Sequence, residues 1–138
     1  MKLSTKSTYG LRAMVNIAMA KDGSAISIKD ISEREGISSV YLEQLLNKLR
    51  RENLVKSVRG PSGGYMLSKT PSRITVGAIV KTLEGSITPV DCAGGREGYK
   101  SVCNHKDTCV AKTVWAKLAK AIDDCLESVT LEDLCGKR

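Results

Sequence analysis

The chain has 138 residues, of which 41% are hydrophobic and 4% aromatic, and a formal net charge of +7. That length and apolar content fit one domain with an aliphatic core and exclude wholesale disorder. The excess charge lies in the first half: residues 1–75 carry 13 Lys and Arg against 6 Asp and Glu, whereas residues 76–138 carry 9 against 9. This asymmetry predicts an N-terminal half that binds a polyanion, with solubility as the alternative role of the charge.

The sequence carries few signs of a membrane protein or an enzyme. No segment approaches the ~18 apolar residues of a transmembrane helix, and polar residues interrupt the first 20 residues as they would not in a signal peptide. We therefore expect a cytoplasmic protein, in which five cysteines are more often metal ligands or redox thiols than disulfides. One histidine and no P-loop, G-x-S-x-G or H-E-x-x-H motif predict a protein that is not an enzyme.

The first part of the chain alternates helix patterns with turn signals. Apolar spacing predicts a helix over residues 7–21, followed by a turn at Asp22-Gly23-Ser24. Ser27 and Asp30 form a capping-box pattern with Asp in place of Glu, which predicts the start of a short second helix. Gly36 marks the end of that helix.

A third helix is predicted from the cap Ser38 to about Glu52. Its apolar residues recur at i, i+3, i+4 and i+7, and they form one stripe: Leu42, Leu45, Leu46 and Leu49. The other faces are largely polar. Two short helices joined by a Gly-containing turn, the second with a polar outer face, are typical of a helix-turn-helix.

A β-hairpin is predicted next. Residues 54–58 and 64–67 read as strands, and the Gly- and Pro-rich tip between them begins with Arg59. A helix-turn-helix followed by a hairpin indicates a winged helix. The third helix would then enter the major groove, and the hairpin would bring Arg59 to the DNA backbone or minor groove.

The second half predicts a helix at 76–84 capped by Thr75, a long helix at 111–127, and a last turn capped by Thr130. One side of the long helix is apolar and comprises Val114, Trp115, Leu118, Ala121, Ile122, Cys125 and Leu126. A second copy of the chain could cover this side, which predicts a symmetric homodimer on a pseudo-palindromic operator. Cys125 would be a small core residue. The expected fold is mainly α with a small hairpin wing: a winged domain at 1–84, a Cys-rich loop at 85–110, and a dimerisation helix with a C-terminal turn at 111–138.

The segment between the last two long helices holds the most distinctive pattern. Cys92, Cys103, Cys109 and the single histidine, His105, lie in a stretch rich in Gly and polar residues. Such a loop has little apolar material to order it, and thiolates that bind an iron–sulfur cluster would supply ordering energy. Structural zinc or a metal-free thiol switch are the alternatives.

Several stretches together resemble the bacterial family of the iron–sulfur cluster regulator IscR, which also contains the nitric-oxide sensor NsrR and the cysteine-metabolism regulator CymR. The most specific are Tyr-Leu-Glu-Gln at 41–44 and Arg-Gly-Pro-Ser-Gly-Gly-Tyr at 59–65; the others are 1–6, 9–11, 30–33, 54–58 and 130–134. The resemblance implies a winged-helix dimer paired through the long helix. Cluster-bearing members carry three loop cysteines, which Cys92, Cys103 and Cys109 match with a longer first spacing. The cluster-free branch lacks them.

The fourth ligand of a 2Fe–2S cluster is where the resemblance stops. In the iron–sulfur cluster regulator, a His is the fourth ligand, and Lys112 occupies its position here. In the nitric-oxide sensor, an acidic residue is the fourth ligand, and Thr8 occupies its position. Neither Lys nor Thr is a plausible iron ligand. His105 is the first candidate. The remaining candidates are Asp91, Glu84, Asp107, Cys125 and an external ligand.

The DNA contacts are predicted from residue type and position. Phosphate contacts fall to Lys2, Thr5, Lys6, Tyr9, Ser38 and Ser39, base contacts to Tyr41, Glu43 and Gln44, and wing contacts to Arg59, Gly60 and Ser62. The predicted function is a transcription regulator controlled by an iron–sulfur cluster and acting on cluster-biogenesis genes. The alternatives are a repressor that responds to nitric oxide or redox state, and a thiol- or zinc-controlled regulator of cysteine metabolism.

Overall fold

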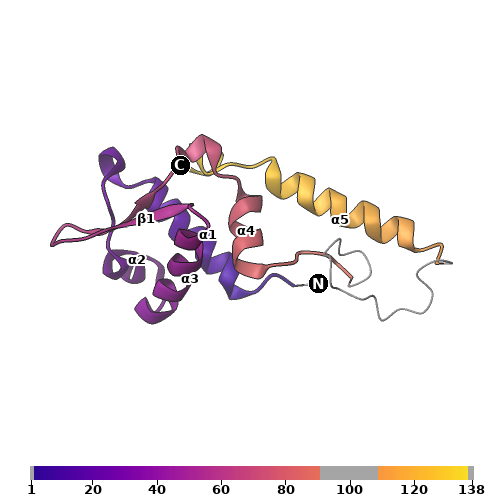
Figure 1. Cartoon of the computed structure of the whole chain (residues 1–138), viewed down its shortest axis with the longest axis horizontal. Helices are drawn as coiled ribbons and strands as arrows, with labels where there is room; N and C mark the ends of the chain where they lie inside the picture. Colours follow the sequence, from indigo (N-terminus) through magenta and orange to yellow (C-terminus); the bar gives the residue numbers. More distant parts are fainter. Residues whose placement is uncertain (1, 91–108, 137–138) are drawn as a thin grey trace.

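The computed structural model describes residues 2–90 and 109–136. Figure 1 shows a cluster of helices with a projecting hairpin at one end of the molecule and one long helix, α5, extending away at the other. The elements are α1 (Thr5–Ala18), η1 (Lys21–Gly23), α2 (Ile28–Glu35), α3 (Ser39–Arg51), β1 (Val55–Val58), β2 (Gly64–Leu67), η2 (Pro71–Arg73), α4 (Val76–Glu84), α5 (Lys112–Glu127) and α6 (Leu131–Cys135). The predicted fold class, mainly helical with a two-stranded hairpin, is confirmed.

Side-chain caps fix where the helices begin. Ser27, Ser38 and Thr75 each accept a hydrogen bond from the backbone N–H three residues on, as predicted. Gly36 ends α2 in the left-handed conformation, with φ of 66°. The predicted bounds of the first helix are wrong at both ends. Ser4 caps it, so the helix begins at Thr5, two residues before Ser7, and it ends at Ala18, before η1.

The core lies between α1, α3 and α4. The four leucines of the predicted α3 stripe are at most 2% exposed. At the crossing of α1 and α4, a Cβ added to Gly10 would overlap Leu83 Cδ1, so any larger residue would force Leu83 to shift. Leu131 of α6 is also fully buried, and therefore the C-terminal turn packs back onto the winged domain.

The wing is a regular antiparallel hairpin. Val55 pairs with Leu67 and Val58 with Gly64. Ile26, which precedes α2, exchanges backbone hydrogen bonds of 3.0 and 2.9 Å with Tyr65, and this bridge ties β2 to the helix-turn-helix next to the last ladder pair, Val58 and Gly64. The strands of the wing are therefore held by the domain, and only the tip beyond them projects.

The long helix α5 touches the winged domain near its C-terminal end. Lys81 of α4 forms ion pairs with Asp123 and Glu127, and Thr75 donates a hydrogen bond of 2.9 Å to Glu127. No α5 residue is buried, and Val114 is 56% exposed. Cys125 is exposed, so its predicted place in the core is wrong for the single chain.

In the described ranges, no helix combines the length and apolar character that crossing a membrane requires.

Candidate nucleic-acid interface

The outward face of α3 is polar and exposed, whereas its inward face is fully buried. Ser38 caps the helix by accepting a hydrogen bond of 3.1 Å from Tyr41 N–H, and Ser38, Ser39, Glu43 and Gln44 are all exposed. The leucines that bury the other side set this orientation, because they fix which residues face outward. The predicted base and phosphate contacts of α3 are therefore accessible, apart from the half-buried Tyr41.

The N-terminal end of α1 lies against the first turn of α3. Thr5 Oγ1 and the Tyr41 hydroxyl share a hydrogen bond of 2.9 Å. The rings of Tyr9 and Tyr41 meet edge to face, with centroids 6.0 Å apart, and the Arg12 guanidinium lies 5.5 Å from the Tyr9 centroid. Tyr9 and Tyr41 therefore join two helices, in addition to any contact they make outside the chain.

Positive and hydroxyl side chains lie beside this junction and at the far end of α3. Lys2, Thr5 and Lys6 are exposed beside the α1 N-terminus, and Lys48 and Arg51 are exposed in the last turn of α3. Such a surface attracts phosphate groups, and the backbone N–H groups at a helix start add to the attraction. Arg12 is different, because it pairs with Glu35 at 2.8 Å and holds α1 to α2.

The wing tip projects from the domain at the end away from α5 (Figure 1). Arg59, Gly60 and Ser62 are exposed there. Gly60 has φ of 110°, and its carbonyl accepts a hydrogen bond of 2.9 Å from Gly63 N–H, which closes the tip. Arg59 therefore stands beside a closed turn and is accessible.

Glu84, at the last turn of α4, is bound to the start of α1. Its Oε1 atom accepts hydrogen bonds from Ser4 N–H at 2.8 Å, Ser4 Oγ at 2.5 Å and Ser7 Oγ at 2.8 Å. Partial burial raises the pKa of Glu84, but the bonds donated by Ser4 and Ser7 outweigh this effect and hold the pKa below its ordinary value. Sequence reasoning treated Glu84 as a possible cluster ligand and missed this contact, because nothing in the sequence pairs residues 80 positions apart.

Only part of the cysteine pattern can be placed. Cys109 is half-buried just before α5, where its carbonyl accepts a hydrogen bond of 3.4 Å from Lys112 N–H. Cys92, Cys103 and His105 lie outside the described residues, as do Asp91 and Asp107. Within residues 2–90 and 109–136, no group of three His, Cys, Asp or Glu side chains could hold a metal ion.

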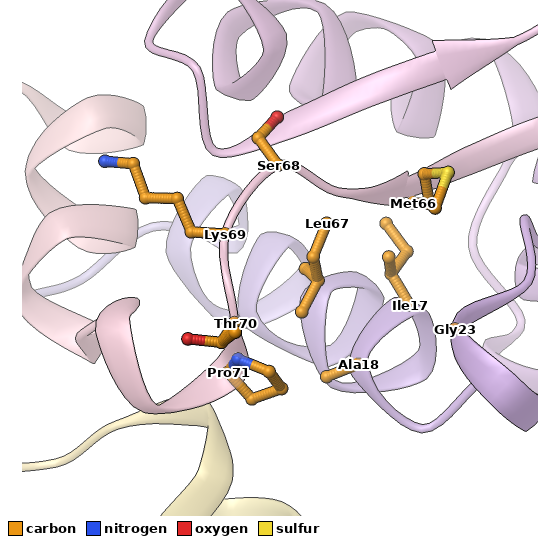
Figure 2. Close-up of a pocket in the computed structure, with 9 residues that line it drawn as sticks. All are labelled: Ile17, Ala18, Gly23, Met66, Leu67, Ser68, Lys69, Thr70 and Pro71. Carbon is orange, nitrogen blue, oxygen red and sulfur yellow. The ribbon is translucent and has the colours of Figure 1, made fainter.

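A pocket of about 350 Å³ lies between the end of α1 and the base of the wing. Figure 2 shows Leu67 beside Ile17, with Ala18 and Pro71 below Leu67. The other lining residues are Gly23, Met66, Ser68, Lys69 and Thr70. Lys69 is the one ionisable group in this lining, so the pocket offers no acid–base pair for catalysis.

A reading helix with an exposed polar face, a basic helix end beside it and a projecting hairpin define a winged helix-turn-helix DNA-binding protein. The sequence model of the Rrf2 family, described as an iron-dependent transcriptional regulator, matches residues 3–137. The chain belongs to the Rrf2 family.

Similar proteins carry two different names. The HTH-type transcriptional regulator IscR of Pectobacterium carotovorum is 40% identical over 138 residues, which are 100% of this chain and 81% of that protein. The structure of the IscR of T. potens is 41% identical, with a TM-score of 0.76, over 97% of this chain and 85% of that one. The structure of CymR, the global cysteine regulator of B. subtilis, is 39% identical, with a TM-score of 0.83, over 100% of this chain and 98% of that one.

Proposed function

We propose that this protein is a homodimeric transcription regulator whose binding to a pseudo-palindromic operator is controlled by an iron–sulfur cluster. The observation that carries the DNA-binding part is the outward face of α3, where Glu43 and Gln44 are exposed beside the basic start of α1. Glu43 would accept a hydrogen bond from cytosine N4, and Gln44 would pair with adenine. Lys2, Thr5, Lys6, Tyr9, Ser38 and Ser39 would position the domain on phosphates, and Arg59, Gly60 and Ser62 would contact the backbone or minor groove.

The second copy of the chain would cover the apolar side of α5. Val114 is 56% exposed, Leu118 41% and Trp115 36%, all on one side of a 16-residue helix that contains no buried residue. Pairing two such helices removes this apolar area from water and sets two α3 helices on successive half-sites. The contacts of Lys81 with α5 would fix how far apart those two helices stand.

The donor set fits a cluster. Three thiols and one imidazole within 18 residues supply the soft ligands that iron–sulfur centres take, with Cys92, Cys103, Cys109 and His105 as the proposed ligands. The hydrogen bonds that Glu84 already accepts from two serines argue against its use as the fourth ligand. A 2Fe–2S cluster, when bound, supplies a centre that oxidants and nitric oxide attack.

The route from the loop to DNA is short. The cysteine-containing segment follows Glu84, the last residue of α4. Glu84 accepts hydrogen bonds from Ser4 and Ser7 at the start of α1, and Thr5 in the same turn of α1 shares a hydrogen bond with Tyr41 of α3. Binding of a cluster by the loop cysteines would alter this set of contacts. Operator affinity would change only as far as the contacts differ between the forms with and without the cluster. On this proposal, the genes controlled are those of iron–sulfur cluster biogenesis, as the resemblance to the family of the iron–sulfur cluster regulator implies.

A cluster-free regulator of cysteine metabolism is the second candidate. It is favoured by the structural likeness to the global cysteine regulator of B. subtilis, which this chain matches over 98% of that chain's length. In that case Cys92, Cys103 and Cys109 would act as thiols or bind zinc. A repressor that responds to nitric oxide or redox state would keep the cluster and differ in target genes.

Anaerobic purification with iron and sulfide analysis and a visible absorption spectrum tests the proposal. We expect absorption in the visible and roughly equal iron and sulfide, with loss of both in Cys109→Ser and weakening in His105→Ala. Cys135→Ser is the matched control, because this thiol lies at the end of α6 and is not a candidate ligand. A colourless protein after reconstitution with iron and sulfide, with one zinc or none, would establish the second candidate.

A further inference from the structure

One apolar side chain interrupts the polar reading face of α3. Val40 is 69% exposed, more than any other large apolar side chain described in residues 2–90. It is the second residue of α3, after the cap Ser38 and Ser39, and it is not among the side chains that pack on the leucine core. An exposed β-branched residue in the first turn of a helix gains nothing from packing and little from helix propensity. The folded chain alone therefore does not explain it.

The position of Val40 places it in line with the two proposed base-reading residues. Residues three and four positions apart lie side by side on a helix, so Val40, Glu43 and Gln44 share one patch. All three are exposed. The first residues of a recognition helix are those that reach the base edges. Ser38 and Ser39, on the turn before, are suited to phosphates instead.

Of the groups that base pairs present in the major groove, one suits contact with an apolar side chain. In the major groove, thymine presents its C5-methyl group, and apolar side chains recognise it by contact. An A·T pair shows the adenine N6 and N7 atoms, which a glutamine binds, beside the thymine O4 and methyl group. If Gln44 binds an adenine, Val40 lies one helical turn earlier and can contact a thymine methyl group in the same base pair or in the adjacent one.

We propose that Val40 is a specificity-determining residue that reads a thymine methyl group in each operator half-site. The inference rests on the proposed DNA-binding function and names one base feature that function must recognise. Burying one methyl group against Val40 is worth about fourfold in affinity, the factor that ~0.8 kcal/mol corresponds to at 1.4 kcal/mol per tenfold. The same contact would disfavour cytosine and guanine, which present no methyl group there.

The test removes the thymine methyl group from the DNA and the Val40 side chain from the protein, each alone and both together. The full-length protein, used both as purified anaerobically and after chelation of iron, selects duplexes from a random-sequence library. Each thymine of the selected site is then replaced in turn by deoxyuridine, which lacks only the methyl group. Affinities are measured for the wild type, Val40→Ser and Val40→Ile. Serine has a helix propensity close to that of valine, and the side chain is exposed, so the fold is retained.

We expect one deoxyuridine position per half-site to weaken the wild type and Val40→Ile about fourfold and to leave Val40→Ser unchanged. Met19→Ser, which removes an exposed apolar side chain at the end of α1, should keep the wild-type response. The inference is overturned if no thymine shows the effect, or if Val40→Ser keeps it in full. Failure of the protein to select any sequence is a different result, since it would overturn the DNA-binding function itself.

Discussion

Ser4 and Glu84 meet where the first and fourth helices of the winged domain touch. The backbone N–H and the hydroxyl of Ser4 both donate to Glu84 Oε1, at 2.8 and 2.5 Å. The same hydroxyl accepts a hydrogen bond from Lys6 N–H and so caps α1. Ser4 therefore begins α1 and joins it to the last residue of α4, at the edge of the proposed DNA contacts and eight residues before Cys92.

Replacing Glu84 by Gln should weaken both the fold and DNA binding. An amide has one oxygen and no charge, so the three bonds from Ser4 and Ser7 lose their charge assistance. We expect a loss of about 1–3 kcal/mol in the free energy of unfolding, measured by urea titration, and lower operator affinity. Glu52→Gln, at the exposed C-cap of α3, makes the same chemical change and should cost little. Equal stability of the two variants would contradict the structural role of Glu84.

Glu84 also predicts how stability depends on pH. Its pKa in the folded protein lies below the ordinary value of 4.5, so the folded state favours the ionised carboxylate. This stabilisation is complete above about pH 4.5 and is lost as the pH falls through the lowered pKa, where both states take up the proton. The gap in unfolding free energy between the wild type and Glu84→Gln should therefore narrow on acidification. Urea titrations from pH 7 to 3 measure it, and a gap that widens would disprove the lowered pKa.

The contact between Gly10 and Leu83 can be tested because the effect of Gly10→Ala on the free energy of unfolding should change sign when Leu83 is shortened. A Cβ at this position would overlap Leu83 Cδ1, and Leu83 is 2% exposed, so its side chain would have to shift within the core. Gly10→Ala should destabilise the wild type by about 1–3 kcal/mol, because overpacking outweighs the gain in helix propensity. In a Leu83→Ala background the overlap is gone, and the same change should stabilise by about 0.5–1 kcal/mol. Additive effects in this double-mutant cycle would refute the contact.

The sequence predicted local structure well because local rules decide it. The caps Ser27, Ser38 and Thr75 and the leucine stripe of α3 follow from short-range hydrogen bonding and from helical period, and each was confirmed. The joint between Ser4 and Glu84 and the bond between Thr5 and Tyr41 link distant parts of the chain, so no local rule predicts them.

The candidate site also contains residues that local spacing places correctly and residues that it does not. Helical spacing was enough to place Glu43 and Gln44 outside, and it could also have singled out Val40, which lies on the same face. Cys125 was misplaced in the core because an apolar helix side indicates burial without saying whether the chain itself or a second copy supplies the cover.

The apolar side of α5 should hold the dimer together. Leu118→Glu places a charge where the second copy would pack, and an unpaired buried charge costs several kcal/mol. We expect the dimer dissociation constant to rise at least a hundredfold in sedimentation experiments, and operator affinity to fall with it. Thr113→Glu adds the same charge to an exposed position on the other side of α5 and should leave the dimer intact. A Leu118→Glu protein that is still dimeric would exclude this surface as the interface.

Arg59 should contribute binding energy through contact with DNA alone. It stands exposed on the closed tip of the wing and forms no ion pair with another described residue, so Arg59→Ala should leave the unfolding free energy nearly unchanged. Operator affinity should fall by about 1–3 kcal/mol, and the slope of log affinity against log salt should lessen by about 1. Lys69→Ala removes an equal charge from the base of the wing and serves as the control for general attraction. If both variants lose the same affinity, the effect of Arg59 is that of net charge, whereas a loss confined to Arg59→Ala assigns the contact to the wing tip.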